Sequence, residues 1–237
     1  LEFRRVLFRS EEDKVNLAVA GWSMGEVEKK GDKPFLNAIS NIMDSLAPGG
    51  VAVFVEAGSP TGFRTISRIR SYIIEHMLDA SVLMPCSHSM KCPLYDPSVL
   101  NKYIKSLDPA LFKTRVNPEI NDSQLAWCHF AQRFKRFPLM RYGERKHAVG
   151  TEKYSYLVVQ KSRTEDIDPK WAASRLVQDP IKRGQHVIAD MCTKDGRIER
   201  QVIPKSIGKD AYRFARKMQW GDAWWWFDNK QNDKEDN

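Results

Sequence analysis

The sequence contains no apolar run that approaches the roughly 20 residues needed to cross a membrane. It also shows no secretory signal peptide and no second pair of closely spaced cysteines. Because a chain of 237 residues can build a core without covalent staples, we expect no disulfide framework. No Ser/His/Asp arrangement indicates a hydrolase. The chemistry of the chain must therefore come from other features.

The chain does carry four cysteines, each beside residues typical of a metal site. Four thiolates are the ligand count of a tetrahedral zinc or of an iron–sulfur cluster. Burial as small hydrophobic residues is the alternative, but Cys86 and Cys92 lie in a loop-like stretch without an apolar face. The contexts are Pro85-Cys86-Ser87-His88, Lys91-Cys92-Pro93, Trp127-Cys128-His129 and Met191-Cys192.

The spacing of the cysteines bears on which metal they would bind. Structural zinc sites usually pair ligands about two to four residues apart, whereas the gaps here are five, 35 and 63 residues. This spacing fits zinc poorly and an iron–sulfur cluster somewhat better, and Cys92-Pro93 resembles the Cys-Pro end of ferredoxin motifs. Spacing alone leaves both metals open. The nearby His88 and His129 are expected to support ligands rather than to be ligands.

A formal net charge of +8 favours a polyanionic partner such as RNA. The densest basic stretch alternates with aromatic side chains, which can stack on unpaired bases while the cations neutralise phosphates. A solvated charged surface with its aromatics in the core is about as good an interpretation of the pattern alone. The basic residues are Arg133, Lys135, Arg136, Arg141, Arg145 and Lys146, and the aromatics are Phe134, Phe137 and Tyr142.

Hydrophobic periodicity predicts an α/β protein. Strands are expected at 15–20 and 51–55, and helices at 34–46 and 63–78. Continuous apolar strands alternating with helices predict a parallel sheet covered on both faces. Further on, we expect short strands at 81–84 and 154–159, a hairpin around Lys194-Asp195-Gly196, a helix near 211–218 and core packing of the aromatic run at 224–227.

Both ends of the sequence call for separate interpretation. Residues 1–10 are arginine-rich and could be a transit peptide, but they resemble a translated sequencing adapter, so we expect them not to be native. Residues 228–237 are polar and expected to be disordered. The native N-terminus, with any targeting signal, is expected to be missing.

Five phrases, in order, carry a resemblance to a known family. The strands at 16–20, 51–55, 81–84 and 154–159 would be the last four strands of a class I S-adenosylmethionine-dependent methyltransferase. The chain resembles, from about residue 15 to 222, the methyltransferase-like family of mitochondrial small-ribosomal-subunit assembly proteins. The phrases lie at residues 56–63, 85–93, 127–130, 152–157 and 220–222.

This resemblance implies the C-terminal half of a Rossmann-like methyltransferase sheet with a cysteine-bearing insertion and a hairpin-containing C-terminal extension. The expected units are a partial domain at 11–160, its insertion at 86–150 and the extension at 161–227. The family carries a [4Fe-4S] cluster, which would here lie on Cys86, Cys92, Cys128 and Cys192 and tie the extension to the core. The resemblance implies the mitochondrial matrix, with small-subunit rRNA and ribosomal proteins as partners and no membrane or DNA.

Three functions follow as alternatives. The first is an assembly and translation factor that binds rRNA and the cluster. The second is an active S-adenosylmethionine-dependent rRNA methyltransferase, although the glycine-rich turn and the acid that bind the donor would precede this sequence. Donor binding is therefore conceivable only in a longer protein, Glu26 is better explained as a helix-start carboxylate, and no catalytic residue is assigned. The third is a zinc-binding interaction module.

Overall fold

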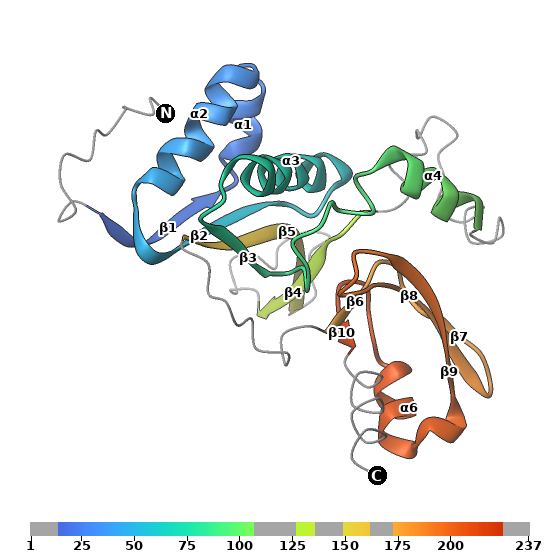
Figure 1. Cartoon of the computed structure of the whole chain (residues 1–237). Coiled ribbons are helices and arrows are strands. Elements are labelled where there is room, and N and C mark those ends of the chain that lie inside the picture. Colours follow the sequence, from blue (N-terminus) through green and yellow to red (C-terminus); the bar gives the residue numbers. More distant parts are fainter. Residues whose placement is uncertain (1–13, 107–126, 136–148, 162–172, 225–237) are drawn as a thin grey trace, which may run out of the picture.

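The computed structural model describes residues 14–106, 127–135, 149–161 and 173–224 (Figure 1). The ends interpreted as an artefact and as a disordered tail, 1–10 and 228–237, lie outside these residues. So do four of the six basic residues in the predicted RNA-binding stretch, namely Arg136, Arg141, Arg145 and Lys146. No helix in the described ranges combines the length and apolarity that a bilayer span requires.

The first sheet contains the four strands expected from the sequence. Its order is β1 (Val15–Gly21), β2 (Leu46–Ala57), β5 (Val149–Lys161) and β3 (Ala80–Met84), and β4 (Phe130–Lys135) pairs with β5. This mixed sheet confirms the α/β class and is consistent with a methyltransferase-like fold. The parallel pairing expected of the strands at 15–20 and 51–55 is confirmed, whereas β5 lies between β2 and β3 and runs antiparallel to both. Apolar runs show that a strand is buried but not which way it points.

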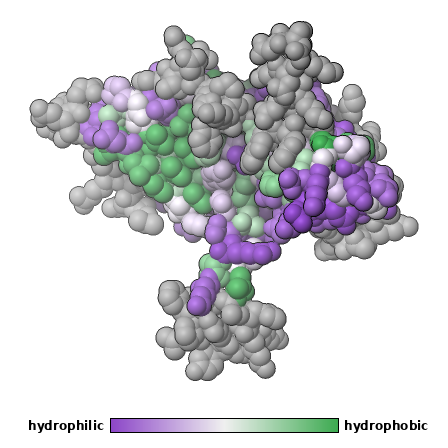
Figure 2. Space-filling model, turned by 90° about the horizontal axis from the view of Figure 1, so that it is seen from below, coloured by the Kyte–Doolittle hydropathy of each residue, from purple (hydrophilic) through white to green (hydrophobic). Residues whose placement is uncertain are grey.

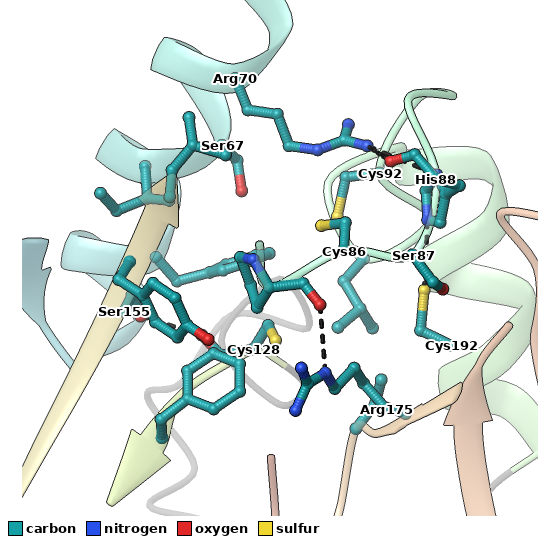
Figure 3. Close-up of a pocket in the computed structure, with 18 residues that line it drawn as sticks. Ser67, Arg70, Cys86, Ser87, His88, Cys92, Cys128, Ser155, Arg175 and Cys192 are labelled. Carbon is teal, nitrogen blue, oxygen red and sulfur yellow. Dashed lines mark hydrogen bonds between the residues drawn. The ribbon is translucent and has the colours of Figure 1, made fainter. Parts of the chain in front are cut away.

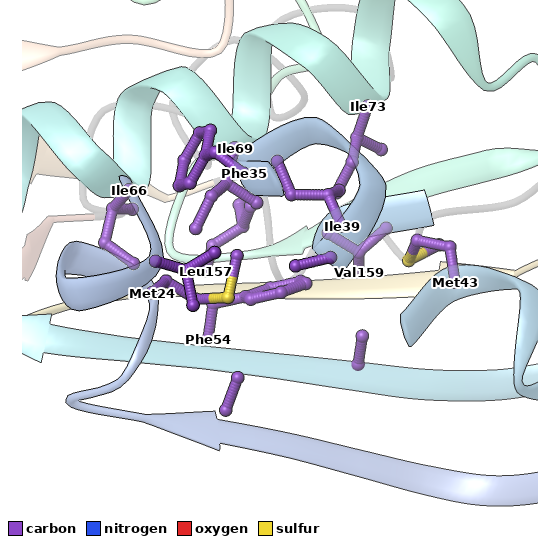
Figure 4. Packing of buried hydrophobic residues seen from close by; sticks show 14 of the residues in the cluster. Met24, Phe35, Ile39, Met43, Phe54, Ile66, Ile69, Ile73, Leu157 and Val159 are labelled. Atoms are coloured by element: carbon purple, nitrogen blue, oxygen red, sulfur yellow. The ribbon is translucent and has the colours of Figure 1, made fainter. Parts of the chain in front are cut away.

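Three helices pack on one face of this sheet (Figure 1). They are α1 (Met24–Glu28), α2 (Asp32–Asp44) and α3 (Pro60–His76). The last begins where the Ser59 hydroxyl accepts the Gly62 N–H at 3.1 Å, with Pro60 at the first helical position. Apolar side chains dominate the core between helices and sheet (Figure 4), and its most buried members include Met24, Phe35, Ile39, Phe54, Ile69 and Leu157.

The opposite face of the sheet is not covered by the described helices, contrary to the expectation of two covered faces. Leu17 and Val19 on β1 are 59% and 65% exposed. They pair in register with Val51 and Val53 of β2. Figure 2 shows an apolar patch on this side of the molecule. The apolar residues of β1 and β2 make this face of the sheet suited to burial. The described part of the chain does not bury it.

The extension forms a second sheet around its own core. The strands are β6 (Ser174–Leu176), β7 (Ile181–Lys182), β8 (His186–Cys192), β9 (Ile198–Pro204) and β10 (Ala223–Trp224), in the order β10-β6-β8-β7 with β9 on β8. The hairpin expected at Gly196 is confirmed, with φ +65° at that glycine. The 3₁₀ turn η5 (Lys205–Ile207) and α6 (Lys209–Ala215) pack on this sheet. Trp224 is buried among them, as expected, while residues 225–227 lie outside the described chain.

Gly221 joins the two units and is expected to tolerate no side chain. Its φ is +91°, and a Cβ there would lie 2.4 Å from the His129 carbonyl oxygen. We expect Gly221→Ala to lower the free energy of unfolding by about 2–3 kcal/mol, through strain and the forced separation of the two segments. Gly184→Ala is the matched control, because a Cβ there meets nothing within 4 Å. Equal denaturation midpoints for the two variants would contradict this contact.

Candidate metal centre

All four cysteines line one cavity between the first sheet and the extension (Figure 3). Cys86 follows β3, and Cys92 lies in the loop that leads to α4 (Pro97–Ser106). Cys128 precedes β4, and Cys192 is the last residue of β8. The predicted set is thus brought together from three separate parts of the chain: the end of the sheet strand β3, the insertion and the extension. All four are free thiols, each partly buried.

Local hydrogen bonds hold the loops that carry these cysteines. The Cys92 carbonyl accepts the N–H groups of Tyr95 and Asp96, both at 3.1 Å. The Ser155 hydroxyl donates to the Cys128 carbonyl at 2.9 Å. The Trp127 indole N–H donates to the Gly58 carbonyl at 3.0 Å. These bonds fix the backbone beside two of the thiols without using the sulfur atoms.

A second layer of contacts ties the insertion to the extension beside the cavity. The Tyr103 hydroxyl on α4 donates to the buried Asp190 carboxylate on β8 at 3.0 Å. Arg200 on β9 pairs with the same carboxylate at 2.8 Å. Burial and the Asp190 charge raise the pKa of Tyr103 well above its usual value. The hydroxyl therefore stays protonated and able to donate.

The cavity is larger than a site for one ion. Its volume is about 40 Å³, and a cavity of about 10–15 Å³ already holds one water molecule. Within the described ranges, no three His, Cys, Asp or Glu side chains converge closely enough to hold a single metal ion. The four thiols surround a space rather than meeting at a point.

Arg70 is the least expected residue of this site. Its side chain projects from α3 toward the cavity (Figure 3) and is only 3% exposed. One terminal nitrogen, Nη2, donates to the His88 carbonyl at 2.7 Å. The other two, Nε and Nη1, find no hydrogen-bond partner in the described part of the chain. A buried cation with orphaned donors costs several kcal/mol unless an anion accompanies it.

A second arginine reinforces the positive character of the cavity. Arg175 lines it and donates from Nε to the Pro85 carbonyl at 3.1 Å. Among the described residues, no aspartate or glutamate lines the cavity. The cavity therefore combines four thiols and two guanidinium groups, which suits a negatively charged occupant.

The thiols themselves are strongly affected by burial. Burial, reinforced by the neighbouring Cys86, raises the pKa of Cys92 to about 11. Burial and the other thiols also raise the pKa of Cys128 and of Cys192. Arg70 acts in the opposite direction on all three. Without a metal these groups are protonated at neutral pH, and a bound metal displaces their protons.

The two histidines have different surroundings. His88 lines the cavity, with Nε2 at 3.4 Å from the Cys192 sulfur and Nδ1 at 3.4 Å from Arg70. Burial and the Arg70 charge lower its pKa to about 4, so the ring is neutral. Because arginine only donates, Nδ1 accepts and Nε2 carries the proton toward the sulfur.

His129 instead packs against Trp127 and Trp220, with ring centroids 5.4 and 4.3 Å away, and does not line the cavity. Burial lowers its pKa to about 4 as well. Of the two expected supporting histidines, only His88 faces a cysteine.

The described part of the basic stretch lies apart from the cavity. Arg133 and Lys135 are exposed on β4, the edge arm that pairs with the first part of β5. The remaining members, Arg136 onward, lie outside the described residues.

Sequence reasoning overlooked Arg70 and Arg175. A signal existed for Arg70, because it lies on the buried stripe of α3 between Ile66 and Ile73. An arginine on the buried side of a helix predicts a buried anion beside it.

The chain was compared with known proteins. The family model described as "Mitochondrial small ribosomal subunit Rsm22" matches residues 4–118 and 112–225. "Rsm22-cox11 tandem protein 2, mitochondrial" of Schizosaccharomyces pombe is 27% identical over 90% of this chain and 29% of that protein. "Ribosome assembly protein RSM22, mitochondrial" of Saccharomyces cerevisiae is 24% identical over 78% of the chain and 40% of its own length. "Ribosome assembly protein METTL17, mitochondrial" of Homo sapiens is 24% identical over 93% and 41%.

The chain therefore spans less than half the length of these curated relatives. The matched ranges nevertheless cover nearly all of it. Both the family description and the relatives' names confirm the predicted mitochondrial localisation. The resemblance inferred from the five phrases is confirmed, and this chain belongs to the mitochondrial small ribosomal subunit Rsm22 family.

Proposed function

We propose that this chain is the part of a mitochondrial small-subunit assembly protein that holds a [4Fe-4S] cluster and contacts ribosomal RNA. The observation that carries the proposal is the four-cysteine cavity with its buried, incompletely paired Arg70. The names of the yeast and human relatives, which call them ribosome assembly proteins, support the assembly role.

The residues present fit such a cluster. Cys86, Cys92, Cys128 and Cys192 would hold it, one thiolate to each iron, so the sulfurs need to surround a body rather than converge on a point. When bound, the cluster supplies four metal–thiolate bonds that link sheet, insertion and extension. Arg70 and Arg175 would compensate the negative charge of the thiolates, and His88 would direct its Nε2 proton at Cys192.

A zinc module is less well supported. Zinc–thiolate bonds of about 2.3 Å would draw four sulfurs tightly around one centre, whereas here the four thiols line a cavity of about 40 Å³. Two guanidinium groups beside the thiols also suit a larger anionic group that can accept several hydrogen bonds.

Methyl transfer is not part of the proposal. At the carboxyl ends of β1 and β2, where open α/β sheets bind ligands, the buried Glu56 carboxylate accepts the Gly25 N–H at 3.0 Å. That bond holds α1 against β2, which gives Glu56 a structural role. Glu26 is exposed in the first turn of α1, as expected for a helix-start carboxylate.

The rRNA contact is tested by crosslinking in mitochondria. A tagged full-length protein containing this chain is crosslinked, immunoprecipitated under denaturing conditions and probed for both rRNAs. We expect enrichment of small-subunit over large-subunit rRNA, and a decrease in the variant Arg133→Glu/Lys135→Glu but not in the control Lys29→Glu/Lys30→Glu. Equal recovery of the two rRNAs would contradict the proposal.

A further inference from the structure

The extension carries more of the positive charge than the first part of the chain. Residues 173–224 contain eleven Lys and Arg against six Asp and Glu, a net charge of +5. Residues 14–106, nearly twice as many, contain ten against eight, a net charge of +2. Of these two parts, the extension therefore holds most of the basic excess.

Within the extension, the charge gathers at the end away from the cysteines. Strand β7 with the turn after it, η5, and α6 with the two residues after it carry seven exposed cations, and Asp210 is the single acid in these segments. We call these seven side chains the distal basic surface: Lys182, Arg183, Lys205, Lys209, Arg213, Arg216 and Lys217.

Hydrogen bonds between these segments make them one surface. The Tyr212 hydroxyl on α6 donates to the Gly184 carbonyl at 3.2 Å. Arg216 Nη1 donates to the Arg183 carbonyl at 2.8 Å. The Lys205 N–H donates to the Gln185 carbonyl at 2.8 Å. Like charges from separate segments are therefore held side by side, which destabilises the isolated protein and favours an anionic partner.

These cations are available for binding. Within the described chain none of the seven forms an ion pair, whereas Arg68 pairs with Glu28 and Asp32, and Arg200 pairs with Asp190. Figure 2 shows the extension as a strongly hydrophilic region at the right of the view.

The chemistry of the surface indicates the class of partner. Protein interfaces have apolar centres and few lysines, whereas nucleic-acid interfaces are polar and positively charged. In the described extension, Val202 on β9 is the one large apolar side chain classed as exposed. We propose that the distal basic surface binds the phosphate backbone of RNA, an inference that rests on the proposed rRNA-binding function and adds a second contact to the basic stretch on β4.

One strand, β8, connects the distal basic surface to the cysteine cavity. Strand β8 runs from His186, beside the basic surface, to Cys192 at the cavity, a span of about 20 Å for seven residues. The thiol that anchors the extension and the surface that would bind RNA thus lie at opposite ends of one strand.

The test measures how RNA affinity depends on salt. Fluorescence anisotropy with a labelled RNA hairpin is recorded over a range of KCl for the full chain and two triple variants. Lys205→Gln/Lys209→Gln/Arg213→Gln removes three charges from the surface, and Lys29→Gln/Lys30→Gln/Lys33→Gln removes three exposed charges elsewhere. Each lost phosphate contact reduces the slope of log affinity against log salt by about 0.7–0.9, so we expect a reduction of about two in the first variant and none in the control.

The outcomes separate this inference from the function on which it rests. Salt-dependent binding that is unchanged in the first variant, or reduced equally in both, overturns the distal surface and leaves rRNA binding standing. Absence of RNA binding by the unmodified chain overturns both. A charge-conserving variant, Lys205→Arg/Lys209→Arg/Arg213→Lys, should keep the full slope of log affinity against log salt. A reduced slope in this variant would show that altered structure, not lost charge, weakens RNA binding, and would also overturn the inference.

Discussion

Cys192→Ser is expected to remove nearly all iron from the anaerobically reconstituted protein and to release the extension from the first sheet. Cys192 is the one cysteine contributed by the extension, and its sulfur faces the same cavity as the other three. A serine hydroxyl is a poor ligand for iron, so the variant loses both a ligand and the link that the cluster provides. Structural metal sites contribute of the order of 10 kcal/mol to folding.

Iron content and the broad visible absorbance of the cluster measure the first effect. Protease sensitivity of the segment after residue 161 measures the second. Ser87→Ala is the matched control, because it alters a residue lining the cavity without removing a thiol. If the Cys192→Ser protein keeps its full iron content and its protease resistance, Cys192 is not a ligand of the cluster.

Arg70→Leu is expected to weaken cluster retention while changing the metal-free protein little. In the loaded form, its orphaned donors would face an anionic group, and hydrogen bonds to charged groups contribute about 1.5–3 kcal/mol. Cluster loss to a chelator should therefore accelerate about tenfold or more. In the metal-free form, removal of an uncompensated buried cation offsets the lost bond to the His88 carbonyl.

The comparison between the two forms distinguishes charge compensation from packing. Arg64→Leu, an exposed position on the same helix, is the control. Arg70→Lys keeps the charge but loses the fork of donors, so its chelator release should fall between the wild type and Arg70→Leu. Equal destabilisation of loaded and metal-free Arg70→Leu protein would show that the arginine serves packing alone.

The structural features that the sequence predicted best are those that depend on local residue patterns. The apolar spacing of α2 and α3 and the Gly196 turn each reflect interactions among nearby residues, and all are confirmed. The residue types alone pointed to the four cysteines as metal ligands, and the resemblance added the [4Fe-4S] cluster, because gaps of 35 and 63 residues do not show which side chains meet in the fold. The structure brings those four residues to one cavity, and whether they hold metal stays a prediction.

Contacts between distant parts of the chain could not be predicted from the sequence, for a physical reason. His88 and His129 have similar sequence signals, each close to a cysteine, yet Trp220 from the extension packs on His129 while Arg70 from α3 contacts His88. Likewise, the direction of β5 depends on how the chain re-enters the sheet. Such contacts are set by tertiary placement, which local periodicity does not encode.

The central claim is that the four cysteines hold an iron–sulfur cluster, and elemental analysis of protein purified without oxygen tests it most directly. Iron, zinc and acid-labile sulfide are quantified per chain. The account predicts about four iron and about four sulfide with negligible zinc. About one zinc per chain without sulfide would contradict it.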